Sequence, residues 1–367
     1  MRIIRAMLIG YILTLLCTAS WAIYGVRISD LSKTPLPENP IKVWGKVTSS
    51  SPIKLSDGRA EITVSGLTAS VGDFLIITGN WAEGVLTANG PVESYIGPAQ
   101  IPMIYIQAGS FLMGNSGVCA DAEYAYCSDE FPQHSVALAA YSIGKYEVTR
   151  GQYRQFMNAG GYISSSYWST DGWSWKVSSS RTEPDYWAAS QDWGLGTFTQ
   201  ADNSPVVGVS YYEAEAFCNW AGGHLPTEAQ WEKAARWNPT TNHSNVYPWG
   251  DTWDVQKCNS FDDTPYINYQ TTPVGVYPSG ASHYGCQDMA GNVSEWCLDR
   301  YDGSYYSQTP SGGWDNPQGP ASGNYRVLRG GSWYNGFDNY FRCACRDAAA
   351  PYVNAYFCWF FGFRLAR

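Results

Sequence analysis

The chain ends in RGGSWYNGFDNYFRCACRDAAAPYVNAYFCWFFGFRLAR, residues 329–367, and this stretch says most about the fold. Its two ends, RGGSW and GFRLAR, combine arginine and aromatic anchors with glycines, which allow close backbone approach. The interior from Tyr334 to Phe361 shows neither strand alternation nor a helical period. It contains no Lys, Glu, Gln or Met, and almost every side chain except Trp359 can arise from an asparagine codon whose adenines are replaced. A fixed frame around such an interior predicts a site that is built to vary.

The composition favours a loop-rich extracellular protein. The 367 residues carry a net charge of −9 and no basic run offsets it, so no nucleic-acid partner is expected. Only 15% of the residues are charged, whereas 16% are aromatic, including 17 Trp and 27 Tyr. Rings in such numbers serve as core filler or as contact surface.

The N-terminus has the pattern of an export signal. Basic residues precede an apolar stretch, 6–16, and the small residues Ser20 and Ala22 occupy the positions that a signal peptidase reads. We expect residues 1–22 to be a cleaved signal peptide and the protein to be exported to the periplasm, the cell surface or the medium. The alternative is a retained anchor, and membrane contact would then be through this segment alone.

Export makes disulfides permissible. Of the ten cysteines, Cys17 would leave with the signal, and the odd number that remains means that at least one thiol is free. Cys345 and Cys358, in the varied interior, are the expected free thiols. Cys119 and Cys127 are expected to bridge a local loop. The sequence assigns no pairing to Cys258, Cys286 and Cys297.

Two domains are expected after the signal. Residues 23–40 are polar and contain prolines, which is typical of a linker. Residues 41–98 hold short β-type runs separated by turn signals, namely IKVWGKV, AEITVSGL, DFLIITGNW and VLTANGPV. They predict a small all-β domain that resembles an OB-type barrel, with a small sandwich as the alternative. Because the segment is not basic, we expect a spacer or adhesion module. Residues 99–367 form the second domain.

Helix signals in the second domain are few but clear. The segment Ser210–Gly223 begins with a Ser N-cap, has Glu213 at the capping-box spacing and ends in two glycines. PTEAQWEKAARW, with Thr227 as N-cap and Gln230 three residues later, predicts a second helix. A third is expected within residues 141–162. The remaining sequence is rich in turns.

Eight strings carry a family resemblance and occur in family order: AGSFLMGN, KYEVTRGQY, SPVVGVSYYEAEAFCNWAGGHLPTEAQWEKAAR, YPWGD, TTPVGVYPSG, DMAGNVSEW, RVLRGGSW and GFRLAR. They cover essentially all of residues 101–367 and resemble the formylglycine-generating, sulfatase-modifying enzyme family. The resemblance implies an α+β variant of the C-type-lectin fold with long loops.

Enzyme members of this family hold copper with a pair of cysteines, the first of them a few residues after the GGS motif. The matching stretch here, Trp333–Phe341, contains no cysteine, so copper is not expected and no catalytic residue is assigned. Copper- and oxygen-dependent oxidation of a sulfatase cysteine to formylglycine is the alternative function. A related branch binds iron through three histidines, but the four histidines here show no paired spacing. They are His134, His224, His243 and His283.

A third branch, the variable proteins of diversity-generating retroelements, fits the C-terminal frame better. In that branch a retroelement rewrites adenines in the last part of the gene. The matching frame residues are Arg342, Ala344, Arg346, Pro351 and Gly362–Arg367. The resemblance implies a non-catalytic protein whose variable segment, 334–361, presents a face to an unknown protein or surface ligand.

Aromatic and asparagine side chains suit such a face, because rings give contact area at low entropy cost. The expected ligand-binding residues are Tyr334, Asn335, Phe337, Asp338, Asn339, Tyr340, Tyr352, Asn354, Tyr356 and Trp359. The segment should form one exposed patch, with Trp333, Phe363 and the RxAxR residues holding the frame.

The resemblance also implies a structural calcium site in DMAGNVSEW, since hard oxygen ligands suit calcium. The implied ligands are the side chains of Asp288 and Glu295 and the carbonyls of Gly291 and Val293. A second calcium site would use Asn259. A family bridge implies a disulfide between Cys218 and Cys343.

Overall fold

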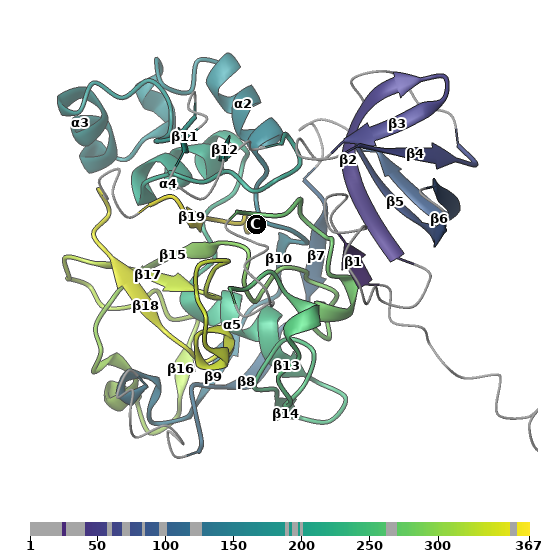
Figure 1. The fold of residues 1–367 in the computed structure, drawn as a ribbon. Coiled ribbons are helices and arrows are strands. Elements are labelled where there is room, and N and C mark those ends of the chain that lie inside the picture. The colour runs from purple at the N-terminus through teal and green to yellow at the C-terminus, as the bar shows by residue number, and fades with distance from the viewer. Residues whose placement is uncertain are drawn as a thin grey trace, which may run out of the picture.

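The computed structural model describes residues 24–26, 41–56, 61–67, 74–82, 85–94, 101–117, 127–187, 191–192, 197–198, 201–261, 270–352 and 358–367. The expected signal peptide lies outside these residues. Among the residues described, no helix is both long and apolar enough to cross a membrane. Figure 1 shows a small β-barrel and a larger mixed domain.

The small domain is built from β1 Tyr24–Val26, β2 Ile41–Ser50, β3 Ile53–Ser56, β4 Glu61–Ser65, β5 Phe74–Ala82 and β6 Val85–Ser94. The last five strands form a closed ring in the order β2–β3–β4–β6–β5 and back to β2. Val43, Ile77 and Leu86 are fully buried. The expected small all-β domain is therefore a barrel. The short strand β1 pairs with β2 from within the stretch expected to be a linker.

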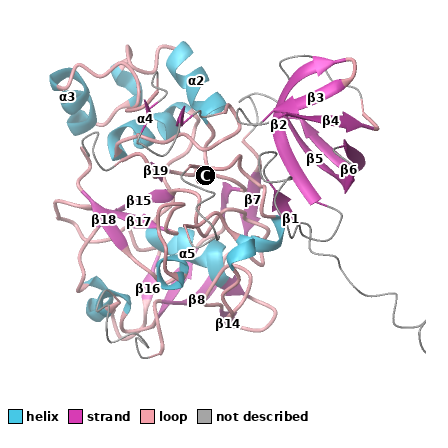
Figure 2. Ribbon diagram, viewed as in Figure 1, coloured by secondary structure: helices cyan, strands magenta, loops and turns pink. Residues whose placement is uncertain are grey.

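The larger domain consists mostly of loops between short strands (Figure 2). Its strands are β7 Met103–Ile106, β8 Gly109–Met113, β9 His134–Leu138, β10 Tyr141–Gly144, β11 Gln191–Asp192, β12 Thr197–Phe198, β13 Trp237–Asn238, β14 His243–Ser244, β15 Ser294–Arg300, β16 Trp314–Asp315, β17 Arg326–Arg329, β18 Asp347–Ala349 and β19 Phe361–Gly362. The central sheet has the order β18–β17–β15–β19, and smaller sheets pair β7 with β10 and β8 with β9 and β16.

The helices of this domain are α2 Arg150–Asn158, α3 Thr170–Ser178, α4 Tyr211–Trp220 and α5 Glu228–Arg236. The three predicted helices are confirmed, because α2, α4 and α5 each begin with a two-sided capping box. The boxes at α4 and α5 use the predicted caps Ser210 and Thr227. Helix α3 was not predicted; its cap, Ser169, binds the Gly172 amide from one side only, which is a weaker sequence signal. Short 3-10 turns, among them η2 Ser128–Glu130, η4 Val255–Lys257 and η7 Asp338–Phe341, complete the domain.

The central sheet separates two apolar cores, because side chains alternate along its strands. Trp296 and Leu328 join the core under α4, and Cys297 and Val327 join the core under α5. Figure 1 shows α4 and α5 on opposite sides of β15 and β17.

The two cores explain why the predicted disulfide between Cys218 and Cys343 is absent. Both thiols are free, and Cys218 lies in the core under α4 whereas Cys343 lies in the core under α5. Cys345 and Cys358 are free, as expected, and the structure adds Cys258, Cys286 and Cys297 to the free thiols. Cys127 is disulfide-bonded, and its predicted partner Cys119 lies outside the described residues.

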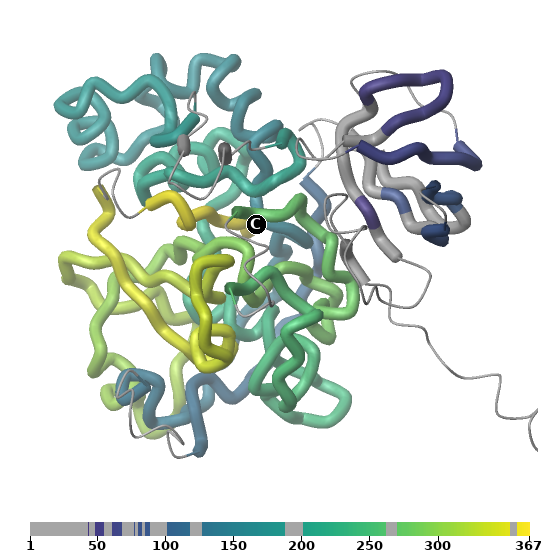
Figure 3. The backbone as a smooth tube through the Cα atoms, in the orientation of Figure 1, coloured from purple at the N-terminus to yellow at the C-terminus, as the bar shows by residue number. Residues whose placement is uncertain are grey.

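The C-terminal strand closes the domain. β19 lies parallel to the start of β15, and Ala366 bridges to both Ile143 and His224. Phe363, Arg364 and Leu365 are buried. Figure 3 traces this last stretch, in yellow, back to the middle of the domain. The GFRLAR end is therefore part of the core, as its fixed composition predicted.

Candidate functional site

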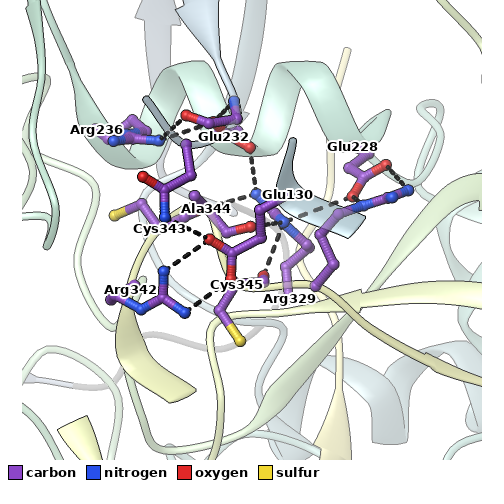
Figure 4. Close-up of polar contacts among 12 residues, drawn as sticks. Glu130, Glu228, Glu232, Arg236, Arg329, Arg342, Cys343, Ala344 and Cys345 are labelled. Carbon is purple, nitrogen blue, oxygen red and sulfur yellow. Dashed lines mark hydrogen bonds and ion pairs between the residues drawn. The ribbon is translucent and has the colours of Figure 1, made fainter. Parts of the chain in front are cut away.

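The chain on either side of the expected ligand face is held by buried charges. Arg329, at the end of β17, donates to the carbonyls of Ala344 at 3.0 Å and Cys345 at 2.7 Å, and it pairs with the Glu232 carboxylate on α5. Both members of the ion pair are fully buried (Figure 4). Since Arg329 binds the backbone carbonyls of residues 344 and 345, these two hydrogen bonds do not depend on which side chains those residues carry.

Arg346 forms the second anchor. Its guanidinium meets the Glu228 carboxylate at 2.7 and 3.1 Å and donates to the Asp129 carbonyl at 3.0 Å. Burial alone would raise the pKa of Glu228, but Arg346 and Arg329 outweigh it, so the pKa lies below its ordinary value. A carboxylate held charged in this way needs both arginines, and α5 is thereby tied to the RCACR segment, residues 342–346.

Arg342 forms the third anchor. It makes a two-pronged ion pair with Glu130 of η2, at 2.7 and 2.8 Å. Burial raises the pKa of Glu130 despite Arg342. The pair joins two stretches 212 residues apart in sequence, and η2 directly follows the disulfide-bonded Cys127.

The glycines of RGGSW allow the turn between strand and face, as predicted. Gly330 and Gly331 have φ angles of 90° and 67°, a region that favours glycine. A Cβ atom on Gly331 would lie 3.0 Å from the Tyr340 carbonyl and 3.1 Å from the Phe341 ring. The return of the chain onto this turn therefore requires glycine.

Three aromatic side chains of the variable segment are exposed. Tyr334 is 49% exposed, Phe337 54% and Tyr352 60%. Asp338 is also exposed, and Tyr340 is half-buried. These residues agree with the expected outward orientation. Asn335 differs, because its side-chain oxygen accepts from the backbone amide and hydroxyl of Ser332 and so stabilises the turn.

A ring cluster brings the two ends of the segment together. The Trp359 ring lies 4.9 Å from Trp333 and 4.7 Å from Tyr334, measured between centroids. Phe360 stacks on Tyr334 at 5.7 Å and 13°. The segment therefore forms one surface from residues 25 positions apart. Asn354 and Tyr356 lie outside the described residues.

The expectation that the side chains of the segment outside its frame point outward is wrong for four of the described residues, and one of them is Cys343, in the core under α5. Phe341 is fully buried, and Cys358 and Phe361 are also buried. Phe341 stacks on Trp253 at 5.0 Å, whereas Cys358 and Phe361 belong to the core under α4. These side chains point inward because they pack against apolar residues of the domain. The codon composition of the segment does not reveal such contacts.

The cysteines nearest to the start of the segment, Cys343 and Cys345, have raised pKa values. Burial raises the pKa of Cys343 and that of Cys345 to about 12. A thiolate is what copper requires, and such thiols stay protonated at neutral pH. Among the described residues no three His, Cys, Asp or Glu side chains are placed to hold a metal.

The predicted calcium motif lies where three carboxylates meet one guanidinium. Glu295 is fully buried and pairs with Arg364, while Asp288 accepts from the Gly275 amide at 2.6 Å. The pKa of Glu147 lies well above its ordinary value because of burial and then of Asp288 and Glu295. The excess of negative charge fits a bound cation, although Arg364 already occupies Glu295. At the second expected site the side-chain oxygen of Asn259 is buried and without a hydrogen-bond partner, as a hard-oxygen ligand would be.

Sequence reasoning missed the acids that hold the frame. Glu228 and Glu232 were read as part of a helix, although their spacing of four residues places them on one helix face with Arg236. That spacing was the available signal. Nothing in the sequence connects Glu130 with Arg342.

Residues 97–367 match the family described as "Sulfatase-modifying factor enzyme 1-like domain". Hercynine oxygenase of Mycolicibacterium thermoresistibile is 36% identical over 232 residues, which cover 58% of this chain and 48% of that protein. Formylglycine-generating enzyme of Thermomonospora curvata is 32% identical over 282 residues, 68% of this chain and 88% of that protein. Treponema denticola variable protein 1 superposes with a TM-score of 0.50 at 26% identity, covering 72% of this chain and 94% of that chain.

The chain belongs to the sulfatase-modifying-factor family, since the match covers most of its length. The expected fold, an α+β lectin-like domain after a small all-β domain, is confirmed, and its structural neighbours include a variable protein. The chain spans about half the length of the hercynine oxygenases that it matches.

Proposed function

We propose that this protein is an exported, non-catalytic binding protein that presents a varied aromatic face to a protein or surface ligand. The observation that carries the proposal is that different residues support the segment and form its exposed surface. Backbone carbonyls and buried ion pairs hold the frame, while Tyr334, Phe337 and Tyr352 are exposed and make little of the core. A face of this kind can change its side chains without losing its support.

The oxidative activities named for the relatives are less well supported in this chain. Residues 333–341, which follow GGS, contain no cysteine, and burial raises the pKa of Cys343 and that of Cys345 to about 12. The likeness of the domain to a variable protein supports display instead. Residues 1–22 remain our proposed export signal.

A display library tests the proposal without knowledge of the natural ligand. Five positions, Tyr334, Phe337, Asp338, Tyr340 and Tyr352, are randomised with asparagine codons whose adenines are replaced. We expect most members to fold, with melting temperatures within about 5 °C of the parent, because exposed substitutions usually change stability by less than about 0.5 kcal/mol. Selection against an immobilised protein such as hen lysozyme should then yield binders.

A second library serves as the matched control. It randomises four buried positions of the same region: Trp333, Phe341, Cys358 and Phe361. Most of its members should fail to fold, since core truncations cost several kcal/mol. If both libraries unfold equally often, the exposed rings are structural and the display proposal fails.

We also propose that the domain binds calcium for stability. The burial of the predicted ligands Asp288 and Glu295, together with the buried side-chain oxygen of Asn259 that has no hydrogen-bond partner, carries this prediction. Chelation should lower the melting temperature by about 5–10 °C, because a ligand at a hundred times its dissociation constant stabilises by about 2.7 kcal/mol. Calorimetry with and without EDTA measures this shift. Asp288→Asn should reduce the response, and an identical melting temperature in both buffers would refute the site.

A further inference from the structure

A ring stack outside the variable segment lies against it. Tyr247 and Trp249 are stacked at 5.5 Å and 9°, and Trp249 lies 5.8 Å from Trp253. Trp253 in turn stacks on the buried Phe341 at 5.0 Å and 15°. We call Tyr247, Trp249 and Trp253 the aromatic shelf. Trp249 and Trp253 are only half-buried, so part of the shelf faces solvent.

The shelf is joined to the variable face at two points. The Tyr247 hydroxyl donates to the Asp338 carboxylate at 3.4 Å. The Phe261 amide, a few residues beyond the shelf, donates to the Asn335 carbonyl at 2.9 Å. Phe261 is itself exposed. A ligand on the variable face would therefore meet the neighbouring loop as well.

The loop that carries the shelf, residues 247–257, does not share the composition of the variable segment. Gln256 and Lys257 lie within it, and replacement of adenines in an asparagine codon gives neither residue. The shelf is consequently a constant part of the surface, whatever the segment 334–361 becomes. If the shelf stays the same while the side chains of residues 334–361 change, the shelf can bind only a chemical group that all of the ligands share.

The charged side chains around the shelf indicate which chemical group of a ligand it would bind. Asp251, Asp254 and Asp338 carry the acidic side chains, of which Asp251 is 55% exposed and Asp254 40% exposed. Lys257 is the cation next to them, 3.6 Å from Asp254, with its ammonium 5.9 Å from the Trp249 ring centroid. His243 lies on Asp251, and Arg342 is neutralised by Glu130. The chain thus already places a cation over the Trp249 ring.

We propose that the aromatic shelf is a constant cation-accepting site, which takes a Lys or Arg side chain from a basic segment of the protein ligand. A ring face and nearby carboxylates attract such a group together. Lys257 then acts as an internal competitor that the ligand's cation displaces. This inference rests on the proposed display function.

The test uses the full chain and a labelled ten-residue peptide of alternating arginine and glycine, with a glutamate–glycine peptide as its control. Trp249→Ala should weaken binding of the basic peptide about tenfold, and added salt should weaken it further. Lys257→Gln should strengthen binding about threefold, because the competitor is removed. Tyr105→Ala, an exposed ring on β7, is the matched control and should change nothing.

The opposite signs of the two substitutions separate a binding role from a structural one. Equal affinity for the acidic peptide, or a Lys257→Gln variant that binds no better than the parent, would overturn the proposal. If Trp249→Ala unfolds, the Lys257→Gln result alone decides. If the randomised face still yields binders while both shelf variants bind the basic peptide like the parent, the shelf fails and the display function stands.

Discussion

Replacing Phe341 with alanine should lower the free energy of unfolding by about 3–5 kcal/mol, the usual cost of truncating a buried phenylalanine. Phe341 is fully buried, it stacks on Trp253, and Gly331 packs directly against its ring. A cavity at this point would separate the RGGSW turn from the loop that supports it. The melting temperature should fall by roughly 6–20 °C.

The matched control lies four residues earlier in the same segment. Phe337→Ala removes a ring that is 54% exposed, so its cost should stay within about 0.5 kcal/mol. Urea unfolding of the two variants measures both values. Similar losses for both would mean that burial does not divide this segment into frame and face.

Replacing Arg329 with methionine should be destabilising by about 3–5 kcal/mol, because two buried carboxylates, Glu228 and Glu232, each lose one guanidinium partner. Glu232 would keep only its second ion pair, with Arg236 at 3.1 Å, and the carbonyls of Ala344 and Cys345 would lose their donors. The RCACR segment would then separate from α5, so the exposed face should also lose its shape. Ligand binding should fall together with stability.

Two controls define the origin of that loss. Arg342→Met removes a guanidinium that is 20% exposed and pairs with one carboxylate, Glu130, so it should cost less than Arg329→Met, which also removes donors to backbone carbonyls. The double variant Arg329→Met, Glu232→Met should recover part of the stability, since Glu232 no longer needs Arg329 and the guanidinium of Arg236 keeps its carbonyl acceptors on Gly114, Ser244 and Asn245. If the double variant is as unstable as the sum of the two single ones, packing around Arg329, not its charge, holds the frame.

Local signals in the sequence predicted the regular elements well. Caps at Ser210 and Thr227 place α4 and α5 because each satisfies backbone amides within one turn. The alternation in EITVS similarly places β4, whose middle residues are buried in the barrel. The missed helix α3 has a cap without the reciprocal acid, so its local signal was incomplete.

The candidate site was predictable only in outline. Composition located the variable segment and its exposed rings Tyr334, Phe337 and Tyr352. It did not show that Phe341 and Cys358 turn inward, or that the Asn335 side chain stabilises a turn, because each depends on contacts with distant residues. The proposed Cys218–Cys343 bridge failed for the same reason, since the sheet that separates them is assembled from residues 294–362.

The sequence by itself determined the family and the order of the elements, because these follow from short-range patterns, and it supplied the prediction that residues 334–361 vary. Only the tertiary structure decided which side chains of that segment are exposed and what supports them. Glu130 meets Arg342 across 212 residues, and Glu232 meets Arg329 across 97. Buried charges must be paired, but the pairing is chosen by the folded chain, since it minimises the cost of removing every charge from water at once.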